Sequence, residues 1–214
     1  MNEPYIHVKF RPELDNPILV AGLPGLGNVG KIVAHLLIES SRAKLFAELY
    51  SPYFPDYIFI DERGICRPSR YEFYASTTSQ NLIILTGDMQ PSLDDVTAHY
   101  EVCGRVLDFI GDYGSKFVIT VCGVPSSSPS KEIYVAATSR MLAAECMEKG
   151  SVIYGRNRIM DDSGLLLGLA KKRGLKGICL MSLTSGLTVD EEAAFRVFKF
   201  LTRILEFVRA HDFC

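Results

Sequence analysis

Short runs of apolar and β-branched residues, each bounded by turn-forming residues, recur along the 214-residue chain. Runs of this kind predict strands that are buried on both faces. Between most of them, apolar residues recur at the spacing of one helix face, which predicts helices packed on a sheet. The strands are expected at residues 18–21, 44–50, 82–86, 117–121 and 176–181, and the helices at 29–39, 93–110, 138–149, 163–173 and 189–210.

The alternation of buried strands and helices predicts an α/β fold. Right-handed β-α-β units would build a mostly parallel sheet with helices on both faces, a three-layer α/β/α arrangement. Residues 52–75 break this rhythm, because short apolar runs at 57–61, 65–67 and 71–75 are separated by turn-forming residues. We therefore expect an inserted antiparallel hairpin or meander there. Neither an internal repeat nor a linker is visible, so residues 1–214 are expected to form a single α/β domain.

The last predicted helix carries more apolar surface than one sheet face requires. One apolar stripe is enough for a helix that covers a sheet. The second stripe indicates burial against a neighbouring helix or against another subunit, and Phe200 and Phe207 are taken as candidate interface residues. The first stripe comprises Phe195, Phe198, Leu201, Leu205 and Val208, and the second comprises Val197, Phe200, Ile204 and Phe207.

Aromatic residues and prolines are concentrated at residues 50–59, beside the predicted hairpin. Tyr53, Phe54 and Tyr57 belong to this segment. Its composition is typical of protein–protein interfaces, so these three residues are candidate contacts with a partner protein. The alternative is that the aromatic side chains pack on the domain itself.

Composition and charge argue against nucleic acid and membranes as partners. Charged residues make up 22% of the chain and the formal net charge is -2, which gives no electrostatic footprint for nucleic acid or an anionic membrane. The longest apolar stretches are under ~10 residues, whereas a membrane helix needs ~20, and residues 1–12 carry charges where a signal peptide would be apolar. A cytoplasmic protein is therefore expected.

Patterns for metal binding and hydrolysis are missing from the sequence. The six cysteines include no C-x-x-C pair, and no histidine stands at metal-ligand spacing, so mostly buried, reduced thiols and no metal site are expected. The sequence contains neither an H-E-x-x-H nor a G-x-S-x-G motif. Acidic groups at residues 94–95, 161–162 and 190–192 each begin a predicted helix, where helix capping explains them better than acid–base catalysis.

A glycine-rich segment at residues 22–31 is the sharpest local motif. Gly25, Gly27 and Gly30 satisfy G-x-G-x-x-G between a predicted strand and a predicted helix, as in dinucleotide-binding folds. Such a loop can bind a dinucleotide or another small anion at the helix N-terminus, or it can serve only to pack the helix closely on the strand. The structural turn is favoured, because Leu23 and Pro24 lengthen a connection that dinucleotide-binding folds keep short.

Several polar residues follow the carboxyl ends of the predicted parallel strands. Loops at these ends meet at one edge of the sheet, where ligands usually bind. Asn28, Asp88, Gln90 and Thr184 are therefore the candidate contacts of a ligand crevice, together with the three motif glycines. The alternative is that these side chains cap helices and shape turns.

Five segments in order, at residues 22–31, 50–55, 85–91, 164–170 and 177–180, resemble the archaeal branch of the proteasome assembly chaperone 2 family. The resemblance extends over nearly the whole chain. It implies a three-layer α/β/α fold similar to the phosphorylase/hydrolase-like class. It also implies homo-oligomers that bind proteasome α subunits without a cofactor, with a glycine loop that need not be catalytic.

Two segments depart from the family pattern. Members that act on proteasomes tend to end in a hydrophobic-Tyr-X tail, whereas this chain ends Asp212-Phe213-Cys214, which leaves Phe213 as the candidate docking ring. Residues 124–130 are rich in serine and proline where relatives are richer in glycine. We expect a non-catalytic, homo-oligomeric protein that binds proteasome α subunits. The alternative is an enzyme or sensor that binds a nucleotide or phosphate at the Gly25–Gly30 loop and the carboxyl-edge crevice.

Overall fold

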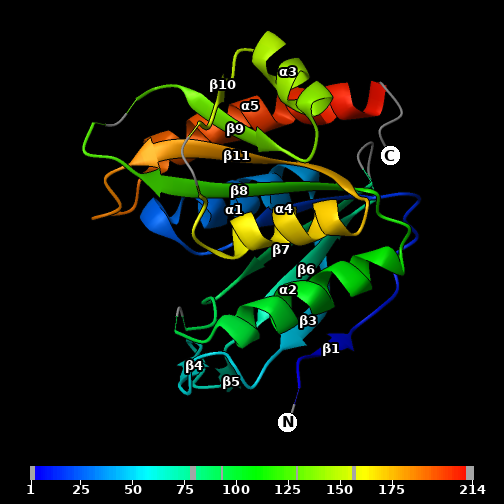
Figure 1. The fold of residues 1–214 in the computed structure, drawn as a ribbon. Coiled ribbons are helices and arrows are strands. Elements are labelled where there is room, and N and C mark those ends of the chain that lie inside the picture. The colour runs from blue at the N-terminus through cyan, green and yellow to red at the C-terminus, as the bar shows by residue number, and fades with distance from the viewer. Residues whose placement is uncertain (1–2, 78–80, 93, 129, 156–157, 211–214) are drawn as a thin grey trace.

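The computed structural model describes residues 3–77, 81–92, 94–128, 130–155 and 158–210. Its main feature is a nine-stranded sheet with the strand order β1-β3-β6-β7-β2-β8-β11-β9-β10 (Figure 1). The strands are β1 (Tyr5–Val8), β2 (Ile18–Gly22), β3 (Lys44–Tyr50), β6 (Tyr71–Ser76), β7 (Leu82–Gly87), β8 (Phe117–Pro125), β9 (Ile133–Ala137), β10 (Val152–Ile153) and β11 (Lys176–Thr184).

The predicted parallel sheet is confirmed at the centre, where β7, β2, β8 and β11 lie side by side and run parallel. Outside this centre the sheet is mixed, since β1, β3 and β6 pair antiparallel and β9 pairs antiparallel with β11. Parallel neighbours require a long crossover, usually a helix. The short connection from β6 to β7 and the hairpin between β3 and β6 supply none, so these strands pair antiparallel.

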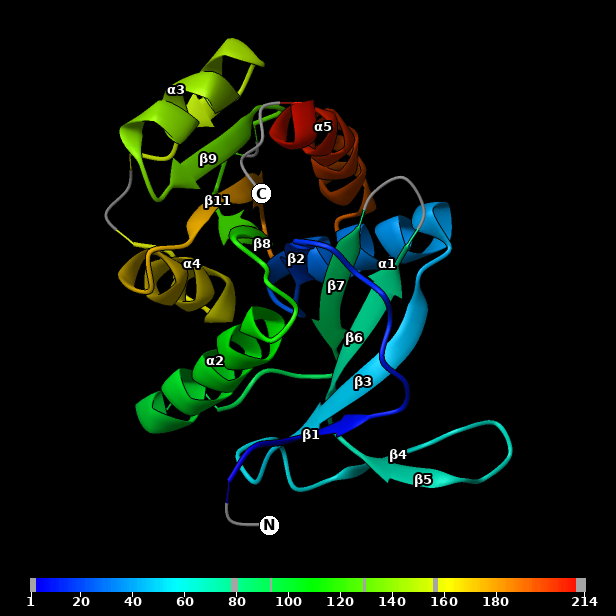
Figure 2. The ribbon, with the colours of Figure 1, turned by 90° about the vertical axis from the view of Figure 1, so that its right-hand side faces the viewer.

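Helices cover both faces of the sheet, as predicted. In Figure 2, α1 and α5 lie on one face, while α2 and α4 lie on the other. α3 lies beside α5, where the Lys149 ammonium is 3.9 Å from the centre of the Phe207 ring. The helices are α1 (Val29–Ser41), α2 (Val96–Gly111), α3 (Arg140–Glu148), α4 (Asp162–Lys172) and α5 (Glu191–Ala210), with a short 3-10 turn η1 (Leu26–Asn28) before α1. No helix among the described residues is both long and apolar enough to cross a membrane.

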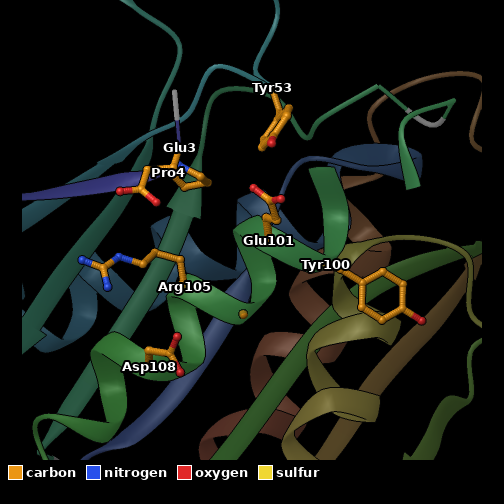
Figure 3. Close-up of a pocket in the computed structure, with 8 residues that line it drawn as sticks. Glu3, Pro4, Tyr53, Tyr100, Glu101, Arg105 and Asp108 are labelled. Atoms are coloured by element: carbon orange, nitrogen blue, oxygen red, sulfur yellow. The ribbon is translucent and has the colours of Figure 1, made fainter. Parts of the chain in front are cut away.

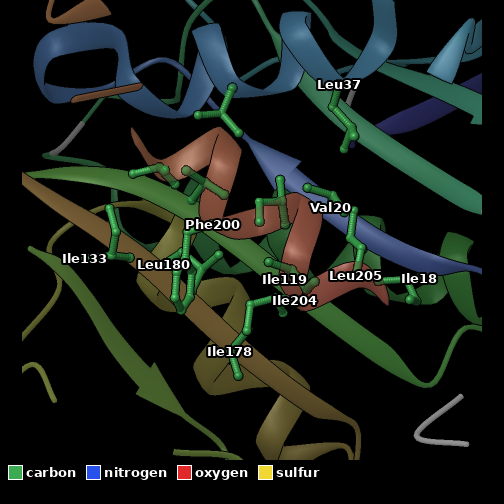
Figure 4. Close-up of a cluster of buried hydrophobic side chains, with 14 of the residues drawn as sticks. Ile18, Val20, Leu37, Ile119, Ile133, Ile178, Leu180, Phe200, Ile204 and Leu205 are labelled. Atoms are coloured by element: carbon green, nitrogen blue, oxygen red, sulfur yellow. The ribbon is translucent and has the colours of Figure 1, made fainter. Parts of the chain in front are cut away.

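The central strands are predominantly apolar because they contribute to a core on each face. In β2, Ile18 and Val20 belong to the cluster under α1 and α5, whereas Leu19 and Ala21 belong to the cluster under α2 and α4. Successive side chains of a strand point to opposite faces, so one apolar run fills two cores. Figure 4 shows the first cluster, with Ile18 and Val20 facing side chains of α5.

The second apolar stripe of α5 packs within the chain. Phe200 is 2% exposed and lies in the cluster under α1 and α5, together with Ile204 (Figure 4). The expectation that Phe200 contacts another subunit is therefore wrong, because the neighbouring helix α1 and the sheet cover it. Phe207 is only partly buried and packs at the edge of this cluster.

The inserted hairpin is present as predicted. β4 (Ile58–Ile60) and β5 (Cys66–Pro68) pair antiparallel in a separate two-stranded sheet. Its turn is closed by Asp61, whose Oδ1 accepts hydrogen bonds from the backbone N–H groups of Arg63 and Ile65, both at 2.9 Å. Figure 2 shows this ribbon extending away from the main sheet below β3.

Candidate functional site

The glycine-rich segment is closely packed against the sheet. A Cβ atom at Gly30 would lie 2.5 Å from the carbonyl oxygen of Val121 and 2.7 Å from that of Leu23. Gly27 has a left-handed backbone with φ 62°, and a Cβ there would lie 2.9 Å from Oγ1 of Thr184. Both positions therefore require glycine for reasons internal to the fold.

Within the motif, the backbone of Gly27 and Gly30 is covered by the chain itself, whereas Gly25 is exposed. The N–H of Asp190 donates a 2.9 Å hydrogen bond to the carbonyl of Gly27, and Thr184 packs on the same glycine. Gly27 and Gly30 are both buried. Phosphate groups are bound where glycine leaves the backbone open to solvent, and this segment instead holds α1 against β2 and β8.

A cavity of about 390 Å³ nevertheless lies at the carboxyl edge of the sheet. It brings together three of the predicted crevice residues, Gly25, Asn28 and Gln90. The other predicted crevice residues do not line it. Its lining consists of Pro24, Gly25, Leu26, Asn28, Met89, Gln90, Pro91, Met160 and Asp161.

Gln90 uses both ends of its amide to join two loops. Its Nε2 donates to the carbonyl of Pro24 at 2.5 Å, and its Oε1 accepts from the N–H of Asp162 at 3.0 Å. The first contact fixes the glycine-rich segment, and the second fixes the start of α4. Gln90 thus has a structural role at this edge.

Asp88 anchors the inserted hairpin. Its carboxylate accepts hydrogen bonds from Nη1 and Nη2 of Arg67 at 2.5 and 2.8 Å, and from the N–H of Arg70 at 3.1 Å. Burial acts to raise the pKa of Asp88, but the hydrogen bonds from Arg67 and Arg70 outweigh it and hold this pKa below its usual value. A bidentate guanidinium–carboxylate pair has a defined geometry, so it orients β5 relative to the end of β7.

A buried polar cluster that no sequence pattern predicted lies between α2, α4 and β6. Asp162 is fully buried and accepts a 2.6 Å hydrogen bond from the hydroxyl of Tyr71. Its other oxygen is 2.5 Å from Nδ1 of His99, whose Nε2 is 3.1 Å from the carbonyl of Ser92. Burial, followed by the charge of Asp162, raises the pKa of Tyr71 well above its usual value. This cluster joins segments that are far apart in the sequence.

The prediction for the acidic pair at the start of α4 is half right. Asp161 caps the helix, since its Oδ1 accepts from the N–H of Gly164 at 3.2 Å. Asp162 points into the core instead. No sequence pattern could have separated the two, because the partners His99 and Tyr71 come from other elements.

The aromatic segment after β3 divides into a buried and an exposed part. Phe54 is 7% exposed and packs on Tyr71 with ring centroids 4.8 Å apart, so its assignment to an interface is wrong. Tyr53 lines a groove of about 510 Å³ beside α2, shown in Figure 3. Tyr57 is 46% exposed at the start of the hairpin.

The hairpin carries an exposed apolar surface, hereafter the hairpin surface, formed by Tyr57, Ile58, Ile60 and Ile65. Ile60 and Ile65 are 66% and 64% exposed. Exposed apolar side chains that are grouped together mark sites of association on protein surfaces. Tyr57 was predicted from the sequence but the isoleucines were not, because their alternation predicts a strand without indicating which face is left uncovered.

Four of the five described cysteines are buried, in agreement with the prediction of mostly buried thiols. Cys103, Cys122, Cys146 and Cys179 are buried free thiols, whereas Cys66 is exposed on β5. Within the described ranges, His, Cys, Asp and Glu form no group of three or more that could hold a metal ion. Phe213 lies outside the described residues.

Comparison with known proteins gives relatives that span nearly the whole chain. The model of the PAC2 family matches residues 19–210. An uncharacterised protein from Methanocaldococcus jannaschii is 31% identical over 191 residues, which are 87% of this chain and 73% of the relative.

Two solved structures from Pyrococcus furiosus have the same fold. PbaB, described as an archaeal proteasome activator, is 36% identical with a TM-score of 0.89, covering 96% of this chain and 90% of that one. PbaA, described as an archaeal homolog of proteasome-assembly chaperone, is 26% identical with a TM-score of 0.78, covering 95% and 86%. The resemblance in the sequence is thereby confirmed, and the chain belongs to the PAC2 family.

Proposed function

We propose that this chain is a non-catalytic, homo-oligomeric and cytoplasmic protein that binds proteasome α subunits. The observation that carries the proposal is the similarity to PbaB, which extends over 96% of this chain in both fold and sequence. PbaB is described as a proteasome activator and PbaA as a homolog of a proteasome-assembly chaperone. A chain that has the same fold over nearly its whole length is therefore expected to bind a related partner.

The hairpin surface is the part of the molecule that we assign to the α subunit. It is apolar and exposed at Ile60 and Ile65. Its base is held by the contact between Arg67 and Asp88, so little conformational freedom remains to be lost on binding. An apolar surface on a fixed support is suited to contact between proteins.

The experiment combines the purified chain with purified α subunits and, separately, with β subunits from the same organism. We expect native mass spectrometry to show complexes with α subunits and none with β subunits, and the chain alone to run as an oligomer in light scattering. Failure to form any complex with α subunits would overturn the proposed partner. A monomer in light scattering would overturn the oligomer.

The alternative function is that of a small-molecule enzyme or sensor, and the cavity beside Gly25 is the observation that favours it. A thermal-shift screen with nucleotides and inorganic phosphate separates the two. A ligand at 100 times its dissociation constant adds about 2.7 kcal/mol to stability, which raises the melting temperature of a chain of this size by about 5–11 °C. The packed glycine-rich segment leads us to expect no shift.

A further inference from the structure

The groove in Figure 3 lies beside α2, between this helix, Tyr53 and the N-terminal residues Glu3 and Pro4. It has a volume of about 510 Å³. Its lining residues on α2 extend from Tyr100 to Asp108, a length of about 12 Å at 1.5 Å per residue. That length accommodates three to four residues of an extended chain. The full lining comprises Glu3, Pro4, Tyr53, Tyr100, Glu101, Gly104, Arg105 and Asp108.

The groove has an acidic character. Three carboxylates and one guanidinium, that of Arg105, line it, and Asp108 is additionally paired with Arg173 at 2.6 Å. Interaction with the Glu101 carboxylate is the main cause that raises the pKa of Tyr53, and desolvation and the negative charge of Asp95 act in the same direction. The residual negative charge therefore favours a cationic occupant.

Two tyrosines flank this charge. The Tyr53 ring packs against the core cluster under α2, and its N–H bonds to Oγ of Ser51 at 3.2 Å, so its position is fixed by the fold. In Figure 3 the Tyr53 ring stands above Glu101, and Tyr100 lies on the other side. Tyr100 is 54% exposed. Aromatic rings beside carboxylates suit ammonium and guanidinium groups, through cation–π contact and charge-assisted hydrogen bonds.

Gly104 lines the groove, and packing among the described residues does not require glycine there. Glycine is the least favourable residue after proline in the interior of a helix. A Cβ atom at this position would meet only Nη2 of Arg173, at 3.7 Å, which is ordinary contact. Glycine also occurs where another molecule approaches the backbone closely. Such an approach would account for glycine at position 104.

We propose that this groove binds a lysine- or arginine-bearing segment of a partner protein, which lies along α2 with its backbone over Gly104 and its basic side chain between Tyr53, Tyr100 and Glu101. The inference goes beyond the proposed function, because it rests on the groove beside α2 and not on the hairpin surface. The extended, open shape of the groove fits a peptide segment better than a compact small molecule.

The test uses two peptides, Ala-Arg-Ala-Arg-Ala and the same sequence with citrulline in place of arginine. Each peptide carries fluorescein at its N-terminus and an amide at its C-terminus. Citrulline keeps the shape of arginine and removes its charge. We expect fluorescence anisotropy to give a dissociation constant at least tenfold lower for the arginine peptide. Equal binding of the two peptides would overturn the charge recognition.

Variants locate the binding to the groove. Gly104→Ala should weaken binding of the arginine peptide at least fivefold while the melting temperature stays the same or rises. Gly111→Ala is the matched control, because Gly111 also lies in α2, has no neighbour within 4 Å of its would-be Cβ, and does not line the groove. Glu101→Gln, which keeps an acceptor for Tyr53, should also weaken binding fivefold. Equal affinities of Gly104→Ala and Gly111→Ala for the arginine peptide would overturn the proposal. A change in the particle mass of Gly104→Ala in light scattering would also overturn it, because it would identify the occupant of the groove as a second copy of the chain.

Discussion

The structural role of the glycine-rich segment predicts opposite outcomes for two of its glycines. In Gly30→Ala, the new methyl group would lie 2.5 Å from the carbonyl oxygen of Val121, about 0.9 Å closer than the 3.4 Å at which ordinary contact begins. The carbonyl oxygen of Leu23 is 2.7 Å away on another side, so both obstacles are backbone atoms that cannot rotate aside. Gly25 is different, since its φ of -178° is extended backbone and a Cβ there would meet its neighbours at 3.6 Å or more.

The magnitude follows from these distances. Overpacking a closely packed site costs about 3 kcal/mol at the upper end of its usual range, and the better helix propensity of alanine offsets about 1 kcal/mol. The remaining loss of about 2 kcal/mol should lower the melting temperature of Gly30→Ala by about 4–8 °C in a chain of this size. Gly25→Ala should melt with the wild type or slightly above it.

Differential scanning calorimetry of both variants beside the wild type provides the assay. The same samples are screened with nucleotides and phosphate, which should shift none of the three. If Gly30→Ala melts like the wild type, or Gly25→Ala loses as much stability as Gly30→Ala, the packing argument is refuted. A ligand-induced shift that is lost in Gly25→Ala would favour the small-molecule alternative.

Four further outcomes can be measured. Tyr71→Phe removes the hydrogen bond to buried Asp162, so the free energy of unfolding from urea titration should fall by about 1–3 kcal/mol, and an unchanged value would contradict the role of the cluster. Burial raises the pKa of Asp161, so its ionised form destabilises the folded state above that pKa. Asp161→Asn should therefore raise stability at neutral pH, and a urea titration repeated at falling pH should show this gain disappear. Ile60→Lys should leave the melting temperature unchanged but weaken α-subunit binding at least tenfold, about 1.4 kcal/mol. Removal of residues 212–214 should change that binding by less than tenfold, and complete loss would show that the tail docks despite its sequence.

The central layer of the fold was predictable because burial on both faces leaves a continuous apolar run. The strands β2, β7, β8 and β11 and the helices α1 to α5 were predicted within a few residues of their observed bounds. β1, β9 and β10 were not, since they lie toward the edges of the sheet and alternate or expose their side chains. The apolar pattern of β3 also could not predict that this strand pairs antiparallel, because the direction of pairing depends on the connection that follows a strand.

The candidate site was predictable only where one segment carries the information. The glycines of the motif and the aromatic residue Tyr57 can each be recognised within a single segment of the sequence. In the structure, Gly27 and Gly30 are closely packed and Tyr57 is exposed. The contact between Asp162 and His99 spans 63 positions, and no periodicity relates such residues. Phe200 was misassigned for a similar reason, since the number of apolar stripes cannot distinguish a neighbouring helix from a neighbouring subunit.

The central claim is that this chain binds proteasome α subunits. The most direct test is an equilibrium titration of the labelled full-length chain with α subunits from the same organism, followed by sedimentation velocity, with and without added nucleotide. The account predicts saturable binding with a dissociation constant of about 1 μM or below, near -8 kcal/mol, and no dependence on nucleotide. Absence of saturation up to about 100 μM α subunits, or binding only when a nucleotide is present, would contradict it.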